Sequence, residues 1–418
     1  MQVFKFGGAS IKEAKAVKNV SNIIKTYGVK PLVIVVSAMG KTTQALEELL
    51  KAHGSSSFQQ KLQNIKTFHL NICKELFNEN HAVFNLIEKE FILLEKIDFE
   101  QQNQILLHAQ VVSVGEITSS LIINNYLNYI GIDSSWLYAP EVVKTKRQYS
   151  EGEVLWNETS DKIKQQLLPI LSKKVVVTQG YIASCDEGII TLGKEGSDFT
   201  AAIFASCLKA DKVTIWKDVP GILNADPKEI NNPTQIFELH YKEASEMTYY
   251  GASVIHPKTI KPLALNAIPL EVRSFDSPLA KPTVISNNNN SVLEPSIIYK
   301  NNQCLFSFKV LDYTFVDEEN MATIFKVLHQ LNLPINMMQN SAISISVCFN
   351  YEEQKVKKLL ELLNHKFTMY YNSGLKLITI KNYTQEMLEK YSPNSEHIFL
   401  EQKSRNNYRA LIKGEVVD

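Results

Sequence analysis

Five consecutive apolar residues, LVIVV at positions 32–36, constrain the fold of this 418-residue chain more than any other feature. Four of the five are β-branched, and β-branched side chains favour strands. A strand that is apolar on both faces is typical of a parallel sheet covered by helices on both sides. Helical patterns separate this strand from other extended segments, at residues 3–6, 132–138, 175–177, 213–216 and 269–275. The alternation predicts an α/β domain with a mainly parallel sheet sandwiched by helices.

The sequence pattern changes near residue 285, at a polar segment that contains four consecutive asparagines, residues 287–290. After it, strand and helix patterns follow the order βαββαβ, which is typical of a ferredoxin-like α+β module. A partial copy follows, with a helix near residues 384–390 and strands near 397–402 and 408–412, and the chain ends before a further helix and strand. We therefore expect three parts: a first domain at 1–285, a linker at 286–300, and a region at 301–418 with one full module and a truncated second.

Composition argues against several classes of function. The 44 basic and 44 acidic side chains give zero net charge, whereas a general nucleic-acid binder needs a basic excess. No run reaches the roughly 18 uninterrupted apolar residues of a membrane span, and the first residues lack the pattern of a signal peptide. Five scattered cysteines without a CxxC pair are typical of reduced intracellular thiols. We expect a cytoplasmic protein that binds neither nucleic acid nor membrane and has no protein-built metal site.

The motif KFGG at residues 5–8 comes directly after the first strand. Gly7 and Gly8 allow the backbone to approach a ligand, and their N–H groups can line an anion site. Lys5 beside them supplies a positive charge for phosphate oxygens. The tetrapeptide alone is equally compatible with a surface lysine before an ordinary turn.

The segment SAMGKTT at residues 37–43 follows the second strand and opens a helix. A P-loop would need glycine five positions before Gly40, but Val35 stands there inside the strand, so we reject that interpretation. The turn still lies at the carboxyl end of a strand, where open α/β sheets bind ligands. Thr42 is therefore a candidate ligand-binding residue, and helix capping is the structural alternative.

A glycine and a glutamate stand together within a long helical pattern. Gly115 in mid-helix costs about 1 kcal/mol relative to alanine, so close backbone contact would explain its presence. Glu116 beside it could bind an ammonium group, although a solvated helix glutamate is the commoner case.

The motif LGKEGSDFT at residues 192–200 places glycines around Lys194 and opens an apolar helix at Ser197 and Asp198. A helix start of this kind offers free N–H groups and partial positive charge to an anionic ligand, which Lys194 would reinforce. Asp198 could hold a lysine or a substrate amine. An N-cap made by Ser197 is the structural alternative, and a cap and a binding site can coexist.

The segment WKDVPGILNADPK at residues 216–228 leaves a strand and turns. Turn chemistry explains its proline and glycine. Two lysines and two aspartates around one turn also suit a nucleotide with its metal; they are Lys217, Asp218, Asp226 and Lys228. A later helix begins at His256 and Pro257, where the histidine is more typical of a structural residue than of a ligand.

Together these segments resemble the aspartate kinases of the amino-acid kinase family. The resemblance runs in order from Lys5 to about Phe275, through the motifs KFGGAS, VVSAMGKTT, GEITSS, VTQGYIA, TLGKEGSDFTAA, WKDVPGILNADPK and YYGASVIHP. Each motif is modest alone, but seven in the family's order are highly specific. The region after the linker resembles, by pattern rather than motif, the ACT modules that follow the kinase domain in that family.

The resemblance implies transfer of the ATP γ-phosphoryl group to the side-chain carboxylate of L-aspartate. The product would be 4-phospho-L-aspartate, which opens the route to lysine, threonine and methionine. The implied cofactors are ATP and Mg²⁺, with the metal carried mainly by the phosphates. The implied catalytic residues are Lys5, Gly7, Gly8 and Asp198; those for aspartate are Thr42, Glu116, Lys194 and Ser197; those for the nucleotide are Lys217, Asp218, Asp226, Lys228 and Lys258.

Several positions depart from the family's pattern. Ala9 replaces a threonine, so a hydroxyl group is lost beside the phosphate site. Lys194 replaces an arginine that grips the substrate carboxylate, and Lys228 replaces another common arginine. Ser253 replaces a lysine that contacts the nucleotide in many members, and Lys258, one helical turn later, is the expected substitute. These changes bear on substrate affinity more than on the type of reaction.

Two alternatives stay open on the sequence. Another amino-acid kinase, acting on glutamate or acetylglutamate, would resemble this chain less at GEITSS and would generally lack paired ACT modules. A non-catalytic amino-acid sensor built on the ACT region would not retain Lys5, Glu116 and Asp198. We also expect a homodimer through the ACT region, because a truncated module leaves strand edges that need covering, and weak or absent feedback by lysine or threonine.

Overall fold

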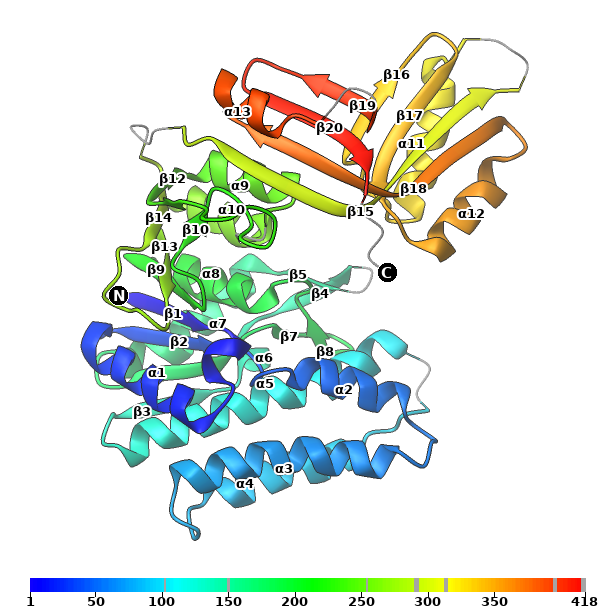
Figure 1. The fold of residues 1–418 in the computed structure, drawn as a ribbon. Coiled ribbons are helices and arrows are strands. Elements are labelled where there is room, and N and C mark those ends of the chain that lie inside the picture. Colours follow the sequence, from blue (N-terminus) through cyan, green and yellow to red (C-terminus); the bar gives the residue numbers. More distant parts are fainter. Residues whose placement is uncertain are drawn as a thin grey trace. The chain divides into compact units, whose positions relative to one another are not determined.

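A computed structural model describes residues 1–100, 103–148, 151–252, 255–288, 293–311, 315–393 and 397–414. The chain forms two compact units (Figure 1). Unit 1 comprises Met1–Ile222, Gln235–Ser245 and Val254–Val292, and unit 2 comprises Leu223–Thr234, Glu246–Ser253 and Leu293–Asp418. Ser253 and part of the asparagine run lie outside the described residues.

Unit 1 is built on an eight-stranded sheet in the order β12-β14-β13-β9-β1-β2-β6-β3. Neighbouring strands are parallel except for β13 and β14, which are antiparallel, so the predicted mainly parallel sheet is confirmed. The strands are β1 (Gln2–Phe6), β2 (Leu32–Val36), β3 (Ser134–Leu137), β6 (Val175–Gln179), β9 (Lys212–Lys217), β12 (Glu238–His240), β13 (Leu270–Ser274) and β14 (Thr283–Ser286). All five residues of β2 are buried, as expected for a central strand covered on both faces.

Short antiparallel pairs accompany this sheet: β4 (Thr145–Gln148) with β5 (Glu151–Val154), and β7 (Ile182–Cys185) with β8 (Gly188–Thr191). A further pair consists of β10 (Ile222–Leu223) and β11 (Gln235–Ile236). The β7–β8 hairpin turns at Asp186 and Glu187, just before Gly188, whereas no clear turn signal in the sequence marks the β4–β5 hairpin.

The helices that accompany the sheet of unit 1 include four between β2 and β3, α2–α5, and one, α9, that continues into unit 2 at Glu246. The bounds are η1 (Gly8–Ile11), α1 (Ala14–Tyr27), α2 (Thr42–Lys51), α3 (Phe58–Leu76), α4 (Val83–Glu95), α5 (Gln104–Tyr129), α6 (Ala139–Val142), α7 (Trp156–Leu171), α8 (Gly196–Leu208), α9 (Tyr241–Tyr250) and α10 (Pro257–Leu265). Figure 1 shows α3 and α4 side by side, and α4 packs along α5.

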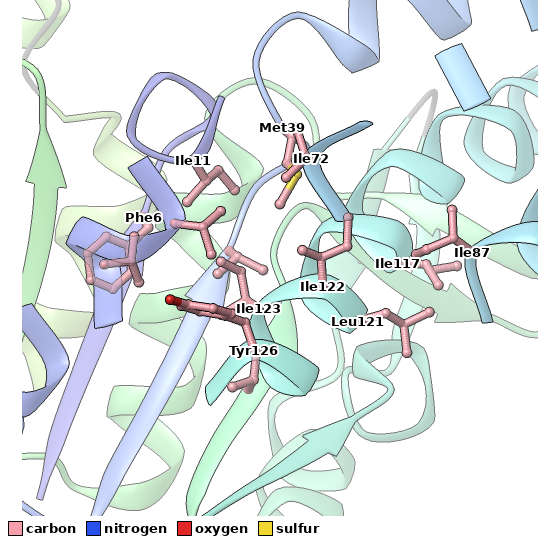
Figure 2. Close-up of a cluster of buried hydrophobic side chains, with 14 of the residues drawn as sticks. Phe6, Ile11, Met39, Ile72, Ile87, Ile117, Leu121, Ile122, Ile123 and Tyr126 are labelled. Atoms are coloured by element: carbon pink, nitrogen blue, oxygen red, sulfur yellow. The ribbon is translucent and has the colours of Figure 1, made fainter. Parts of the chain in front are cut away.

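Helix α5 runs through the main hydrophobic core. Figure 2 shows Ile122, Ile123 and Tyr126 of α5 in one cluster with Phe6 and Met39. The helix is long and apolar enough to cross a membrane by length and composition, but 83% of its most apolar 18-residue window is buried inside the structure. Burial of this kind is what a central helix of a folded core requires.

Gly115 explains how closely α5 approaches the segment that follows β2. A Cβ atom at this position would lie 2.9 Å from Ala38 Cβ and 3.1 Å from Thr42 Cγ2. The close backbone contact predicted from a mid-helix glycine is therefore present. It brings the neighbouring Glu116 up against the carboxyl end of β2.

Unit 2 contains a six-stranded antiparallel sheet in the order β16-β17-β15-β18-β20-β19. Its elements are β15 (Ser296–Val310), α11 (Glu318–Gln330), β16 (Met337–Asn340), β17 (Ser344–Asn350), α12 (Glu353–Leu363), β18 (Phe367–Lys381), α13 (Gln385–Tyr391), β19 (Ile398–Lys403) and β20 (Asn407–Lys413). The first six strands and helices follow the predicted βαββαβ order. The remaining strands extend the same sheet, because β15 and β18 are long enough to pair along both parts.

The structure groups the chain differently from the predicted division at residues 285 and 300. Strand β15 begins at Ser296, inside the segment expected to be a linker. Two earlier segments, 223–234 and 246–253, belong to unit 2. They are held there because Ile297 N donates to Asn224 O at 2.8 Å and Glu246 pairs with Lys381 at 3.0 Å. Such contacts between distant segments leave no local sequence signal.

Candidate active site

A cavity of about 770 Å³ opens in unit 1 where several parallel strands end. Phe6 is in register with Val36 on one side and with Trp216 on the other, so β1, β2 and β9 end together. The residues at these ends, together with the N-terminus of α8, line the cavity. They include Lys5, Gly8, Ser37, Ala38, Gly40, Lys217, Gly193, Lys194, Glu195, Gly196, Ser197 and Asp198. Ligands bind at this edge in open α/β sheets.

Two lysines flank the carboxylate of Asp198 in the cavity wall. Lys5 Nζ lies 2.7 Å from Asp198 Oδ1, and Lys217 Nζ lies 3.8 Å from Asp198 Oδ2. Burial would raise the pKa of Asp198, but the charges of Lys5 and Lys217 outweigh burial and hold its pKa below the ordinary value. The group is therefore ionised near neutral pH, and it fixes two ammonium groups beside the Gly7-Gly8 turn.

Glu116 presents a second carboxylate to the same cavity in a different electrostatic setting. Its side chain is buried, with the residue 2% exposed, and Ala38 N donates to Oε1 at 3.4 Å. Its Oε2 atom has no hydrogen-bond partner among the described residues. Burial raises the pKa of Glu116 to about 8. A buried acceptor without a partner is costly, and a cationic ligand group in the cavity would satisfy it.

Helix α8 begins at Gly196 without a side-chain cap, since its N-cap residue is Glu195 in the left-handed conformation. The alternative role of Ser197 as N-cap is therefore wrong. Ser197 instead packs against Gly180, where any Cβ atom would overlap its side chain. The first turn of α8 carries Ser197 and Asp198 directly into the cavity wall.

The structure does not bring Thr42 to the cavity; the neighbouring Thr43 lines it instead. The Thr42 hydroxyl donates to Met39 O at 2.6 Å and lies 3.4 Å from His69 Nε2. His69 is fully buried, and this burial lowers its pKa to about 4, so the ring is neutral near pH 7. The hydroxyl of Thr42 thus serves the turn that closes β2.

Gly7 and Gly8 keep the β1 turn close to its neighbours. A Cβ at Gly8 would lie 2.6 Å from Ala38 O, and a Cβ at Gly7 would lie 3.4 Å from Lys5 Nζ. Gly8 lines the cavity directly. A side chain at position 8 would therefore overlap the backbone that follows β2, and the approach of this turn to a ligand stays a prediction.

The predicted nucleotide residues are placed less uniformly. Lys217 lines the cavity, whereas Asp218 is exposed and is not among the lining residues. Asp226 and Lys228 are exposed residues of unit 2, where Lys228 N donates to Asp226 Oδ1 at 2.9 Å. Lys258 forms an ion pair with Glu151, which lines the cavity.

Several residues that line the cavity were not among the site residues predicted from the sequence: Ser37, Gln104, Ile105, His108, Glu151, Tyr181 and Thr191. Tyr181 lies inside the quoted VTQGYIA motif, and its φ of 69° is rare for a residue with a side chain. Burial raises the pKa of Tyr181 to about 12, so its hydroxyl stays protonated. Left-handed strain beside a cavity is itself a sign of function, but it is visible only in the structure.

Comparison with known proteins agrees with this geometry. The amino acid kinase family model matches residues 1–274. The chain belongs to the amino acid kinase family. Within the family it is related to the aspartokinases: it is 30% identical over 350 residues to lysine-sensitive aspartokinase 3 of Escherichia coli, across 82% of this chain and 77% of that protein. It is 31% identical to aspartokinase 2, chloroplastic, of Arabidopsis thaliana, across 82% of this chain but 65% of that longer protein.

Solved structures of this amino acid kinase group share the fold. The crystal structure of E. coli aspartokinase III in complex with aspartate and ADP, in the R-state, superposes with a TM-score of 0.86 at 26% identity, covering 99% of this chain and 96% of that one. The same enzyme with lysine and aspartate, in the T-state, gives a TM-score of 0.80 with the same coverage. The fold class predicted from the sequence is therefore confirmed in both of its parts.

Proposed function

We propose that this protein is an ATP-dependent aspartate kinase, which transfers the γ-phosphoryl group to the side-chain carboxylate of L-aspartate. The observation that carries the proposal is one cavity that combines two opposite electrostatic settings. Lys5 and Lys217 gather around Asp198, whereas the buried carboxylate of Glu116 lacks a partner for one oxygen among the described residues. An acceptor that carries both anionic groups and an ammonium group suits such a cavity.

The reaction needs no general base among these residues. The aspartate side chain is already ionised near pH 7, so its oxygen attacks the γ-phosphorus directly. One P–O bond forms, the bond to the bridging oxygen breaks, and ADP leaves with that electron pair. Catalysis then depends on position and charge stabilisation, which Lys5 and Lys217 supply while Asp198 keeps them in place.

The substrate amino acid would be held by three residues of the cavity. Glu116 accepts from the α-ammonium group and thereby satisfies its own buried Oε2. Lys194 is exposed to the cavity and would pair with the α-carboxylate as a point charge. Ser197, in the first turn of α8, supplies a hydroxyl group.

The nucleotide and its metal remain proposals that rest on charge. We assign Lys217, which lines the cavity, and Asp218 of the same unit to the nucleotide side; the assignment of Asp226 and Lys228 stays a prediction from the sequence. No cluster of three or more acidic, histidine or cysteine ligands occurs among the described residues, and Asp198 already faces two lysines. We therefore propose that Mg²⁺ would be held mainly by the phosphate oxygens of ATP, where the ion would neutralise phosphate charge.

A coupled assay of ADP release tests the proposal. Purified protein receives ATP and Mg²⁺ with aspartate, glutamate or acetylglutamate in parallel, and Lys5→Ala serves as the inactive control. We expect release that depends on aspartate and is much weaker with the other two. Stronger release with glutamate or acetylglutamate would assign the protein to a different amino-acid kinase activity, and no release with any acceptor would favour a sensor.

The wider assignments are also proposals: a cytoplasmic enzyme at the start of lysine, threonine and methionine biosynthesis, and a homodimer through the ACT region. In the described sheet β19 has β20 as its only strand partner, and its Gln402 side chain donates to Met338 O of β16; we propose that a second copy covers the remaining backbone groups of its outer edge. Light scattering at micromolar concentration tests the dimer, and a monomer mass would contradict it. Activity with millimolar lysine, threonine or both tests the expected weak feedback, which strong inhibition would refute.

A further inference from the structure

The position of the Lys194 ammonium group depends on the loop that carries it, because the side chain itself makes no fixing contact among the described residues. Its ammonium group forms no ion pair or hydrogen bond within the described part of the chain, and the residue is exposed at the cavity. A long flexible side chain without partners can meet a substrate carboxylate reliably only if its backbone is fixed. Contacts of the loop at residues 193–195 must therefore fix it. The importance of this loop rests on the proposed function, in which Lys194 binds the substrate carboxylate.

The first end of this loop lies against Glu151, the first residue of β5. Gly193 has a φ of 77°, and a Cβ atom there would overlap the carboxyl group of Glu151. The carboxyl group therefore sits directly on the backbone that precedes Lys194. Glu151 is in turn held by an ion pair with Lys258 Nζ.

The second end is held by the same part of α10. Glu195, with a φ of 54°, accepts a hydrogen bond from His256 N at 2.9 Å. His256 Nδ1 accepts from Lys258 N at 3.2 Å and so caps the helix that carries Lys258. Both residues that flank Lys194 are thus connected to the first turn of α10.

We propose that Glu151 and Lys258 form a positioning pair for Lys194, which sets the affinity for the carboxylate of the substrate amino acid. Lys258 then acts on the amino-acid side of the cavity through Glu151, and not as the nucleotide ligand that the sequence predicts. The side chains of Lys258 and Glu151 are 40% and 37% exposed. Because partly exposed ion pairs contribute little, the expected change in affinity is modest, about two- to fivefold.

The test uses Glu151→Gln, Lys258→Met and the charge exchange Glu151→Lys with Lys258→Glu. Glu153→Gln is the matched control, since Glu153 lies two residues away in the same strand and pairs with Lys146 at 3.1 Å outside the cavity lining. We expect both single variants to raise KM for aspartate about two- to fivefold. The values of kcat and KM for ATP should stay unchanged in both single variants. The charge exchange should recover part of the lost affinity for aspartate, and Glu153→Gln should behave as wild type.

Amide hydrogen exchange of the peptide that contains residues 193–196 gives a readout that does not need turnover. We expect faster exchange in Glu151→Gln and Lys258→Met than in wild type or in Glu153→Gln. If wild type consumes no ATP with aspartate, the proposed function fails, while the exchange result still tests the positioning pair. Unchanged exchange in both variants would overturn the inference. The inference would also be overturned if KM for ATP rose in Lys258→Met and fell in Glu151→Gln. Such a result would show that Lys258 binds the nucleotide directly.

Discussion

One group of buried amides in unit 2 and one buried carboxyl group in unit 1 differ in how they are satisfied. In unit 2, Asn336 Nδ2 donates to Gln303 Oε1 at 2.7 Å and to Asn350 Oδ1 at 3.0 Å. Gln303 Nε2 also donates to Asn350 Oδ1 at 2.9 Å, and Lys300 Nζ donates to Asn336 Oδ1 at 2.8 Å, so the buried amides of Gln303 and Asn336 find their partners within the protein. In unit 1, by contrast, the buried Glu116 faces the cavity with one oxygen that no described residue satisfies.

This difference separates a scaffold from a binding site. Buried amides that are hydrogen-bonded within the protein stabilise one arrangement of strands and need no ligand to satisfy them. A buried carboxylate with an open oxygen lowers stability in the free protein and favours a ligand that supplies the missing partner. Substitutions at the cavity should therefore change the kinetic constants, whereas substitutions in the amide network of unit 2 should change the free energy of unfolding.

Lys5→Ala should have the strongest effect of any single change in the cavity. Loss of one charge contact to the transferring phosphoryl group should lower kcat on the order of 10²-fold or more. The variant should still fold, because Asp198 keeps Lys217 as a cationic partner. Steady-state kinetics measures kcat, a denaturant titration verifies folding, and near-normal kcat in a folded variant would remove Lys5 from the mechanism.

Glu116→Gln should act on substrate binding. We expect KM for aspartate to rise roughly 10- to 100-fold, since a charged partner for the α-ammonium group is lost. In wild type, KM for aspartate should fall as pH rises from about 6 to 8, because the pKa of Glu116 in the free protein is about 8 and the ionised form binds the cation. A variant that keeps the wild-type KM would show that the ammonium group binds elsewhere.

The same substitution should stabilise the fold at alkaline pH. Because the folded pKa of Glu116 is raised above its unfolded value, its contribution to stability is present at low pH and is lost as pH rises towards 8. Glutamine cannot ionise, so Glu116→Gln should exceed wild type at pH 9 by several kcal/mol, at roughly 1.4 kcal/mol for each unit by which the pKa is raised, and by much less at pH 5. Urea titrations at both pH values measure this, and equal stability at pH 9 would contradict the raised pKa.

Gln303→Leu should lower stability and leave the kinetic constants unchanged. It removes the acceptor Oε1 of the bond from Asn336 Nδ2 and the donor Nε2 of the bond to Asn350 Oδ1, so the free energy of unfolding should fall by about 1–3 kcal/mol. The kinetic constants for aspartate and ATP should stay close to wild type below the melting transition. A large change in kcat with unchanged stability would mean that this network belongs to the catalytic apparatus.

Lys194→Arg should change the protein least. A guanidinium group can grip a carboxylate through two bonds, so KM for aspartate should fall roughly fivefold, equivalent to about 1 kcal/mol, at unchanged kcat. Michaelis–Menten titration of aspartate at saturating ATP measures it. An unchanged or higher KM would indicate that the loop is adapted to lysine.

The sequence was sufficient where a signal is local. The apolar run at 32–36 predicted a buried parallel strand, the KFGG and GKEGSD motifs located Lys5, Lys194 and Asp198 at the cavity, and Gly115 predicted a close helix contact. The sequence was not sufficient where a contact between distant residues determines which side chain reaches the cavity. Neighbouring threonines look alike in sequence, yet packing against His69 turns Thr42 away and leaves Thr43 at the cavity.

Long-range contacts also explain the remaining differences. Glu151 reaches the cavity only because the β4–β5 hairpin folds over Gly193, and no motif marks that hairpin. The segment 223–234 begins inside the motif WKDVPGILNADPK but packs in unit 2, where Ala225 belongs to a hydrophobic cluster with Ile297 and Ile378. Sequence pattern predicts which elements form more easily than which distant elements meet.

Trapping of the acyl phosphate product detects phosphoryl transfer to aspartate itself rather than ATP consumption alone. Hydroxylamine converts an aspartyl phosphate into aspartate hydroxamate, which can be quantified against ADP release. We predict hydroxamate in a one-to-one ratio with ADP when ATP and aspartate are both present, and a decrease on the order of 10²-fold in Lys5→Ala. ADP release without hydroxamate, or equal hydroxamate from a folded Lys5→Ala variant, would mean that this cavity does not phosphorylate the aspartate side chain in the way proposed.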